Sequence, residues 1–446
     1  MRLVRLRCRL LLWVALMGVV AVAAGCGGGS DSTGGAGSSG ADATSGAAET
    51  TGSGGATEMP AVELEPGFSD WPYFGRVPER THYLADDPVD RIFLDPPLRQ
   101  AWSINTHALI EFPPAIHRGV AYVINKFGNG KAVRLSDRKV LWELNLDPKN
   151  KGEEPVDVTG PVYYKGKVFG AFKDGHLAAG DAKSGKEVWV KDLHAELESS
   201  PLVIGGLLYI GTNGKQLLAL DPDTGKTVWK YQAPDEIKAS TSYHAGTVFG
   251  ADYASAMFAL DARSGKQIWS TDTSQAGGSG GFFSSPAVAF GRVYAARDDG
   301  TVFALDEKTG KIEWSFPTGA AVYGSPAVAQ VPGTPPTVYI GSENGTFYAL
   351  DAKTGKQRWS YEVGGPVPGT ATVIGHTVYT SSFTPHRTVG LDARTHKKTF
   401  ELGQGGYTPV VSDGKRLYLV GYYTLIGLEP TAKAKAKDRK GAGKQG

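Results

Sequence analysis

The sequence has almost no cysteine. Its only two, Cys8 and Cys26, lie near the N-terminus, and everything after Cys26 is cysteine-free. This absence excludes a disulfide-built scaffold, a cysteine-ligated zinc or iron–sulfur site and a thiol enzyme from the main part of the chain. The nine histidines are also dispersed, without the spacing of metal ligands on a helix or hairpin. We therefore expect no metal site.

The main body also lacks positive charge. The formal net charge is +2, but residues 1–25 carry +4 and residues 432–446 carry +5, which leaves −7 for residues 26–431. Proteins bind nucleic acid through clustered Lys and Arg that neutralise phosphates. A mildly acidic body therefore argues against nucleic acid as a partner.

An apolar run long enough to cross a membrane is missing from the N-terminus. The run from Leu10 to Ala24 has 15 residues, short of the roughly 20 that span a bilayer. It follows an Arg-rich start and ends in Ala23-Ala24-Gly25-Cys26, which resembles a bacterial lipobox. That resemblance implies a lipoprotein signal peptide at residues 1–25 and lipidation of Cys26. A plain cleaved signal and an uncleaved anchor are the alternatives.

Two further segments are too polar or too simple to bury a core. Residues 26–60 are rich in Gly, Ser, Ala and Thr, and we expect a disordered tether there. Residues 432–446 alternate Lys and Ala, and we expect a disordered basic tail that contacts anionic headgroups or cell-wall polymers, or is simply solvated. Together with the lipid on Cys26, these segments predict an extracytoplasmic protein anchored to the cell membrane, or to the outer membrane if there is one.

Internal repetition dominates residues 98–431. The motif Ala-Leu-Asp-x-x-Thr-Gly-Lys-x-x-Trp recurs, sometimes in degenerate form, and its aromatic positions are spaced 40 to 47 residues apart. A period of about 40–45 residues fits one four-stranded propeller blade. Eight aromatic positions mark the repeats: Trp102, Trp142, Trp189, Trp229, Trp269, Trp314, Trp359 and Phe400.

A second series gives the same count. Each repeat opens with a short Ser-Pro-like start, and there are eight such starts between Pro114 and Pro409. Trp102 lies in an outer-type strand without the three strands that should precede it, and the last repeat lacks an outer strand. The chain is therefore predicted to be all-β, an eight-bladed propeller of four-stranded antiparallel blades. The N-terminal outer strand would complete the C-terminal blade and remove free sheet edges.

These repeats resemble the pyrroloquinoline-quinone (PQQ)-type propeller family, whose signature is Ala-x-Asp-x-x-x-Gly-x-x-x-Trp. In that family the Trp docks between adjacent blades. The resemblance implies this structural role for Trp142, Trp189, Trp229, Trp269, Trp314 and Trp359. The segment from Asp70 to Gly75 resembles the lead-in found before such propellers, so residues 61–97 are expected to pack on the propeller rather than form a domain.

The family resemblance does not by itself imply the cofactor. Quinoprotein dehydrogenases of this type use PQQ with Ca²⁺, an Asp base, a Trp beneath the quinone and, in many, adjacent cysteines. Here the body has no Cys, and every Trp after Trp71 already occupies a blade position. We therefore expect no catalytic residue and no bound cofactor.

Loops between the second and third strands share one propeller face, which commonly carries function. The candidate binding-face residues are Lys126, Asp174, Asn213, Tyr253, Arg297, Asp298, Glu343 and Arg387. Their mix of charges, amides and aromatics suits proteins or peptides, whereas solvated turn residues are the alternative for most of them.

The sequence thus predicts a non-catalytic, membrane-anchored lipoprotein that binds envelope proteins or peptides. It resembles the lipoprotein propeller subunit of the outer-membrane β-barrel assembly machinery. The alternatives are a PQQ- or Ca-dependent quinoprotein dehydrogenase and an envelope sensor that binds a polymer or small ligand. The oligomeric state is left open.

Overall fold

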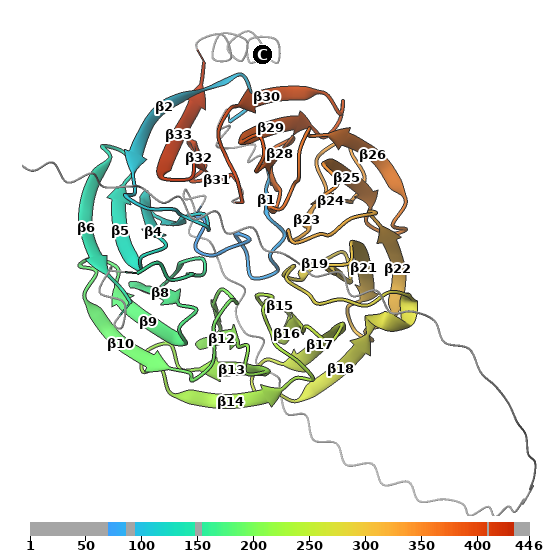
Figure 1. The fold of residues 1–446 in the computed structure, drawn as a ribbon, viewed down its shortest axis with the longest axis horizontal. Coiled ribbons are helices and arrows are strands. Elements are labelled where there is room, and N and C mark those ends of the chain that lie inside the picture. Colours follow the sequence, from blue (N-terminus) through green and yellow to red (C-terminus); the bar gives the residue numbers. More distant parts are fainter. Residues whose placement is uncertain (1–69, 86–93, 148–153, 408–409, 432–446) are drawn as a thin grey trace, which may run out of the picture. The chain divides into compact units, whose positions relative to one another are not determined.

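The computed structural model describes residues 70–85, 94–147, 154–407 and 410–431, all within the unit Thr57–Gly446. Eight sheets surround a common axis (Figure 1), which confirms the predicted all-β, eight-bladed propeller. Within these ranges the one helix is the 3-10 turn η1 (Thr273–Ala276). No helix in the described part is long and apolar enough to span a bilayer. The expectations for residues 1–25, Cys26, the tether and the basic tail lie outside the described residues.

The first four blades follow one another along the chain, with their strands in sequence order from the axis outward (Figure 1). They comprise β3 (Ala115–His117), β4 (Val120–Ile124), β5 (Asn129–Arg134) and β6 (Lys139–Asn145); β7 (Val162–Tyr164), β8 (Lys167–Ala171), β9 (His176–Asp181) and β10 (Glu187–Asp192); β11 (Leu202–Ile204), β12 (Leu207–Gly211), β13 (Gln216–Leu220) and β14 (Thr227–Gln232); and β15 (Ser242–His244), β16 (Thr247–Ala251), β17 (Ala256–Asp261) and β18 (Gln267–Asp272).

The last four blades continue the same order, and the eighth takes its outer strand from the beginning of the propeller. They comprise β19 (Ala287–Ala289), β20 (Arg292–Ala296), β21 (Thr301–Asp306) and β22 (Ile312–Pro317); β23 (Ala327–Ala329), β24 (Thr337–Gly341), β25 (Thr346–Asp351) and β26 (Gln357–Glu362); β27 (Thr372–Ile374), β28 (Thr377–Ser382), β29 (Arg387–Asp392) and β30 (Lys398–Leu402); and β31 (Val411–Ser412), β32 (Leu417–Val420), β33 (Thr424–Pro430) and β2 (Leu98–Asn105).

The ring closes where the sequence predicts. Strand β2 pairs antiparallel with β33, and Trp102 lies opposite Gly427. A Cβ at position 427 would lie 2.3 Å from the Trp102 ring, so glycine is required for this close approach. Pairing the first blade strand with the last sheet covers an edge that would otherwise offer unpaired backbone groups.

A repeated turn connects the third and fourth strands of most blades. In the third blade the Asp221 carboxylate accepts hydrogen bonds from the Thr224 amide at 2.8 Å and hydroxyl at 3.0 Å. Gly225 follows with φ +69°, a left-handed conformation that glycine adopts without strain. The same side-chain turn forms at Asp181, Asp261, Asp306 and Asp351. The Asp-x-x-x-Gly part of the repeat therefore encodes a local turn.

The tryptophan of each repeat contacts the turn of the next blade. The Trp229 indole Nε1 donates to the Ala262 carbonyl at 3.0 Å, and its ring lies against Gly265, where a Cβ would approach it to 2.6 Å. Trp359 instead stacks on His396, which replaces the glycine, with ring centroids 5.2 Å apart. Indole-to-carbonyl bonds to the next blade are also made by Trp142, Trp189, Trp269 and Trp314.

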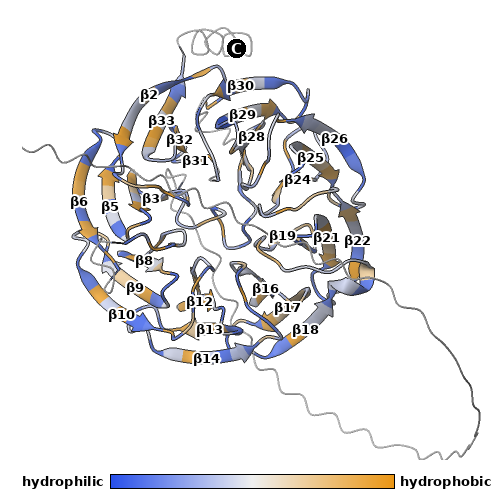
Figure 2. Cartoon of the chain, in the orientation of Figure 1, coloured by the Kyte–Doolittle hydropathy of each residue, from blue (hydrophilic) through white to orange (hydrophobic). Residues whose placement is uncertain are grey.

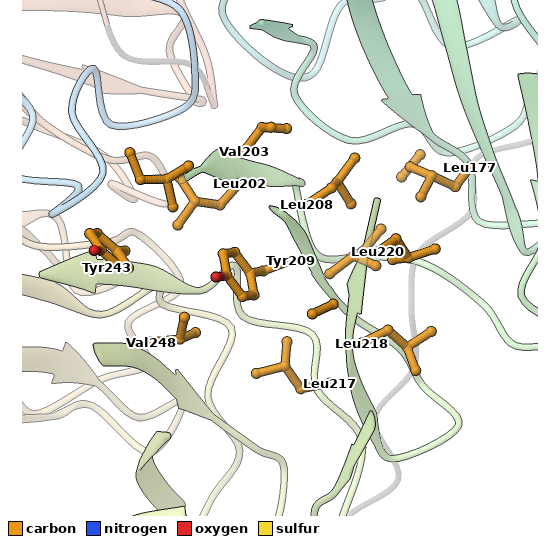
Figure 3. Close-up of a cluster of buried hydrophobic side chains, with 14 of the residues drawn as sticks. Leu177, Leu202, Val203, Leu208, Tyr209, Leu217, Leu218, Leu220, Tyr243 and Val248 are labelled. Carbon is orange, nitrogen blue, oxygen red and sulfur yellow. The ribbon is translucent and has the colours of Figure 1, made fainter. Parts of the chain in front are cut away.

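The core lies between neighbouring blades. Second and third strands are buried on both faces, whereas outer strands such as β14 bury only some residues. Figure 2 shows apolar residues in the strands of every blade, interspersed with hydrophilic ones on the outer strands. In the cluster of Figure 3, Leu177, Leu202, Tyr209 and Val248 are contributed by three successive blades. Packing between sheets makes the blades one structural unit.

Part of the lead-in segment lies across the axis. Trp71 forms an isolated bridge with Ile116, and β1 (Tyr83–Leu84) pairs parallel with β27. Between these points the segment accepts backbone hydrogen bonds from the inner strands of further blades, for example Val288 N–H to the Glu79 carbonyl at 2.9 Å. Residues 70–85 thus contact inner strands around the axis, and this segment crosses the centre of the ring in Figure 1.

Candidate binding pocket on the propeller axis

A pocket of about 430 Å³ lies on the axis. Most of its wall comes from the residues just before the innermost strand of each blade, and all eight blades contribute. Two lysines, Lys126 and Lys173, reach it from the turns between second and third strands. The pocket therefore opens on the face where the sequence places the candidate binding loops.

The floor of the pocket includes Phe74 from the lead-in segment. The Arg80 side chain is fully buried and donates hydrogen bonds to the carbonyls of Phe74 and Thr241, the latter at 2.5 Å. Its remaining nitrogen lies 3.3 Å from the Ser200 carbonyl. Burial lowers the pKa of Arg80 to about 9, so the group stays charged at neutral pH. The lead-in segment, held by these bonds from Arg80 to backbone carbonyls, closes the axis at this end (Figure 1), which we call the sealed end.

One side of the pocket carries alternating charges, which we call the lysine–carboxylate row (Glu111, Lys126, Asp157, Lys173, Glu198 and Lys238). Lys126 Nζ lies 2.9 Å from both Glu111 and Asp157. Lys173 bridges Asp157 and Glu198 at 3.5 and 3.8 Å, and Lys238 continues to Glu198 at 3.7 Å. Residues far apart in sequence thereby form one continuous ionic row.

This pairing shifts the pKa values of Lys126 and Asp157. Burial alone would lower the pKa of Lys126, but hydrogen bonds to Asp157 and Glu111 outweigh it and raise that pKa. Burial alone would raise the pKa of Asp157, but the hydrogen bond and charge of Lys126 lower it. Lys126 and Asp157 are therefore both ionised at neutral pH and present fixed charges to the pocket.

The other side of the pocket is aromatic. Phe283 and Tyr323 pack edge to face with ring centroids 5.6 Å apart. Tyr407 is half exposed and packs against Phe383 at 4.7 Å. Lys238 Nζ lies 4.6 Å from the ring centroid of Tyr253 and joins the two sides. We call Phe112, Phe283, Tyr323 and Tyr407 the aromatic wall.

Glu343 stands apart from the row. Its Oε1 atom is buried and has no hydrogen-bond partner among the described residues. Burial raises the pKa of this carboxyl. Its charge acts on Tyr323 and Tyr407, which both line the pocket. Glu343 is therefore the carboxyl beside the pocket best suited to exchange a proton.

The structure brings only some of the sequence-predicted binding residues to the pocket. Lys126 lines it, and Tyr253 and Glu343 lie beside it. Asp298 accepts a hydrogen bond from the Gly281 amide at 3.0 Å in the loop that leads to Phe283. Arg297 is buried rather than exposed, because it binds Asp299 and the Gly277 carbonyl of that same loop.

The remaining three candidates make contacts within the rim. Asp174 pairs with His176 at 3.0 Å, and Arg387 pairs with Glu401 at 3.4 Å. Asn213 donates to Glu198 at 3.0 Å and so supports the lysine–carboxylate row from outside. None of these three lines the pocket.

Sequence reasoning missed most of the pocket. The missed groups are the carboxylates of the row, Lys238 and the aromatic wall. Most of them lie a few residues before a Ser-Pro-like repeat start. The Ser-Pro-like start marks the innermost strand of each blade. Residues just before it therefore lie beside the axis, and this placement is the signal that could have identified them.

Curated relatives of this chain are alcohol dehydrogenases by name, most of them quinone-linked. The quinohemoprotein alcohol dehydrogenase ADH-IIG of Pseudomonas putida is 28% identical over 173 residues, which is 35% of this chain and 23% of that protein. Others are named "alcohol dehydrogenase (quinone), dehydrogenase subunit" and "1-butanol dehydrogenase (cytochrome c)". The matched region spans less than a quarter of the length of the Pseudomonas relative.

These relatives correct three expectations. The predictions of a non-enzyme, of no cofactor and of a non-catalytic binding scaffold are wrong by this comparison, which favours the dehydrogenase alternative. The membrane anchor at Cys26 stays a prediction. The expectations rested on missing adjacent cysteines and a missing spare tryptophan. Adjacent cysteines and a spare tryptophan are one way to enclose a planar ring. Their absence does not exclude such a ligand, because Phe and Tyr side chains line this pocket.

Solved structures resemble the fold over most of the chain. Quinohemoprotein alcohol dehydrogenase from Comamonas testosteroni matches with a TM-score of 0.65 and 18% identity, over 81% of this chain and 80% of that chain. BamB from Moraxella catarrhalis matches with a TM-score of 0.59 and 19% identity, over 74% of this chain and 97% of that chain. At these identities the likeness establishes the propeller fold.

The family model covers most of the propeller. It carries the description "outer membrane protein assembly factor BamB" and matches residues 129–242 and 235–437. Those residues include seven of the eight blade-marking aromatics proposed from the sequence, from Trp142 to Phe400. The chain therefore belongs to the PQQ-like β-propeller family that this model describes.

Proposed function

We propose that the axial pocket binds a planar quinone of the PQQ type and that the protein uses it to oxidise a small alcohol. The observation that carries the proposal is the pocket itself, in which a row of lysines faces an aromatic wall on the axis. Its volume of about 430 Å³ falls in the usual range of small-molecule sites. The names of the curated relatives support the choice of quinone and alcohol.

The donor set fits the organic part of such a cofactor. PQQ is planar, aromatic and carries carboxylates, so it needs a flat apolar face and cationic donors. Phe283 and Tyr323 offer ring edges and faces, and Lys126 and Lys238 offer ammonium groups. These lysines are partly exposed and bound to carboxylate side chains, which a ligand carboxylate replaces without disturbing the backbone.

The described residues do not fit a metal in the same way. They contain no group of three or more His, Cys, Asp or Glu side chains arranged to hold a metal ion. The carboxylates of the row are instead bound by lysines. We therefore derive no step through a metal.

The chain's own residues would perform binding, orientation and proton transfer. Oxidation of an alcohol releases two electrons and two protons, and a bound quinone is the acceptor that supplies this chemistry. The lysine–carboxylate row would fix the ligand's charged edge while the aromatic wall excludes water from its ring. The Glu343 carboxyl beside the pocket, whose pKa burial raises, would accept the alcohol hydroxyl proton.

The proposal is tested by reconstitution of the full chain. Purified protein is mixed with PQQ, with and without Ca²⁺, and bound quinone is measured after gel filtration alongside dye reduction by primary alcohols. We expect stoichiometric quinone and alcohol-dependent turnover. We expect Glu343→Gln to keep the quinone but lose at least tenfold in turnover. The control Lys215→Met removes an exposed pair with Asp235 and should change neither. Absence of bound quinone and of turnover in the wild type would refute the proposal.

A second candidate function is ligand binding without chemistry, as in an envelope sensor. One observation favours it: each lysine of the row is already paired with a carboxylate, so the pocket is closer to neutral than a site dedicated to anions. A neutral, aromatic-lined pocket also suits a sugar ring. Calorimetric titration with oligosaccharides separates the two functions, because saturable sugar binding without PQQ binding favours the sensor.

A further inference from the structure

A ring of hydroxyl groups lies at the deep end of the pocket. The Ser240 hydroxyl accepts a hydrogen bond from the Ser200 amide at 2.8 Å, and the Ser285 hydroxyl accepts one from the Ser240 amide at 3.2 Å. The pattern continues through Ser325 and Thr370, each at 2.9 Å. Each bond joins one blade to the next beside the axis. We call Thr159, Ser240, Ser285, Ser325 and Thr370 the hydroxyl floor, since all five line the pocket.

The hydroxyl floor has unused donors. Each serine or threonine hydroxyl in these interblade bonds accepts an amide hydrogen, so its own hydrogen is left to donate. Within the described residues, no acceptor for those hydrogens is within reach of Ser240, Ser285, Ser325 or Thr370. Thr159 Oγ1 is buried and has no hydrogen-bond partner at all among the described residues.

Burial makes these unused donors informative. Thr159 is 2% exposed and Ser285 is 3% exposed. A buried hydrogen-bond donor without an acceptor is unfavourable, so several around one axis indicate that another molecule supplies acceptors. A carboxylate accepts several hydrogen bonds at once and donates none. It therefore matches a floor that offers donors and whose oxygens are mostly occupied by amide hydrogens.

We propose that the hydroxyl floor is a carboxylate-binding subsite on the propeller axis, which takes the leading carboxylate of a planar aromatic ligand. This inference deepens the proposed function, on which it rests, by giving the ligand a direction. One carboxylate lies deepest among the hydroxyls above Phe74. The ring lies against the aromatic wall, and the lysine–carboxylate row meets the outer edge of the ligand.

The chain offers closely matched variants. Thr159→Val removes a hydroxyl that has no protein partner and keeps the side-chain shape. Ser325→Ala removes one hydroxyl of the floor together with one interblade bond. Ser200→Ala is the control, because Ser200 accepts the Gly160 amide at 3.0 Å in the same pattern but does not line the pocket. Thermal unfolding midpoints of the two alanine variants should therefore match.

The test is calorimetric titration of the full chain with two probes, benzene-1,3-dicarboxylate and its neutral diamide. We expect the wild type to bind the dicarboxylate and to bind the diamide at least tenfold more weakly. Thr159→Val and Ser325→Ala should each weaken dicarboxylate binding about tenfold, the effect of one hydrogen bond to a charged group, whereas Ser200→Ala should stay within twofold.

The outcomes separate the subsite from the proposed function. No binding of the dicarboxylate by the wild type, or equal effects of Ser325→Ala and Ser200→Ala together with no effect of Thr159→Val, would overturn the subsite. The expected pattern without PQQ-dependent alcohol oxidation would support the subsite and refute the dehydrogenase. PQQ-dependent alcohol oxidation whose KM for PQQ is the same in Thr159→Val as in the wild type would support the dehydrogenase and refute the subsite.

Discussion

Charged side chains at the two ends of the propeller axis are stabilised by different kinds of partner. At the sealed end, Arg80 is fully buried and bound to backbone carbonyls, and the lead-in segment pairs with the inner strands. At the open end, Lys126 and Lys238 are partly exposed and bound to carboxylate side chains. Backbone partners are fixed by the fold, whereas side-chain partners move aside for a ligand. The lead-in segment therefore forms a structural plug at one end, while the eight repeats form the binding site at the other.

The largest expected effect lies at the sealed end. Arg80→Met would leave the carbonyls of Phe74 and Thr241 without a donor in a buried place. We expect a loss of at least 3 kcal/mol in the free energy of unfolding, since bonds to a charged group are worth about 1.5–3 kcal/mol each. Urea unfolding measures it. The control Arg99→Met removes an exposed pair with Glu429 and should cost under about 1 kcal/mol. Similar losses for both variants would show that Arg80 is not a plug.

The next effect is a pH dependence of stability, also at the sealed end. His82 is fully buried, neither of its ring nitrogens has a hydrogen-bond partner in the described part of the chain, and burial lowers its pKa to about 3. Below its ordinary pKa of 6.5 the unfolded chain takes up a proton that the folded chain refuses. Stability should therefore fall as pH drops from 6.5 towards 3, by about 1.4 kcal/mol per pH unit for this one group.

The comparison variant for this pH effect is His82→Asn, because His82 has φ +52° and Asn tolerates that conformation. Urea unfolding should show that the free energy of unfolding of the wild type is about 2 kcal/mol lower at pH 5 than at pH 6.5, and that the variant lacks this difference. Equal pH slopes in the two proteins would mean that another group controls acid stability.

A smaller effect is expected at the open end. Lys238→Met removes a cation that contacts both Glu198 and the Tyr253 ring. We expect PQQ binding to weaken about tenfold, while the free energy of unfolding changes by less than about 1 kcal/mol because the group is near the surface. Titration followed by fluorescence quenching gives the affinity. A large loss of stability with unchanged affinity would place Lys238 with the structural residues of the sealed end.

The smallest effect separates ring from hydroxyl in the aromatic wall. Tyr323→Phe keeps the ring that packs on Phe283 and should change PQQ affinity less than twofold. Tyr323→Ala removes the ring and should weaken binding about fivefold, since aromatic stacking is worth about 0.5–1.5 kcal/mol. Equal effects of the two variants would assign the contribution to the hydroxyl and not to stacking.

The same comparison explains what the sequence predicts well. Asp221, Gly225 and Trp229 each act on residues within their own blade or a neighbouring one. Their repetition at one period therefore gives the blade count and the closing strand. Local turns and contacts between neighbouring blades can be recognised in a periodic sequence because the residues that form them recur in each repeat.

The pocket is harder to predict because it uses the non-repeated residues. Asp157, Glu198 and Lys238 come from three successive blades and are joined in one ionic row because those blades bring them together beside the axis. Arg80 was expected only to lie in a segment that packs on the propeller, and nothing in the lead-in sequence indicated that a charged residue would be fully buried. Serines of the hydroxyl floor were visible as repeat starts, but their unused donors become evident only in three dimensions.

The most direct test of the open end as a ligand site is a crystal structure of the full chain with PQQ. We predict quinone density on the axis, with its ring against Phe283 and Tyr323 and one carboxylate within hydrogen-bond distance of Thr159 and Ser325. The Arg80 contacts at the sealed end should be unchanged. Quinone bound outside the axial pocket, or a pocket that holds none at saturating concentration, would contradict the account.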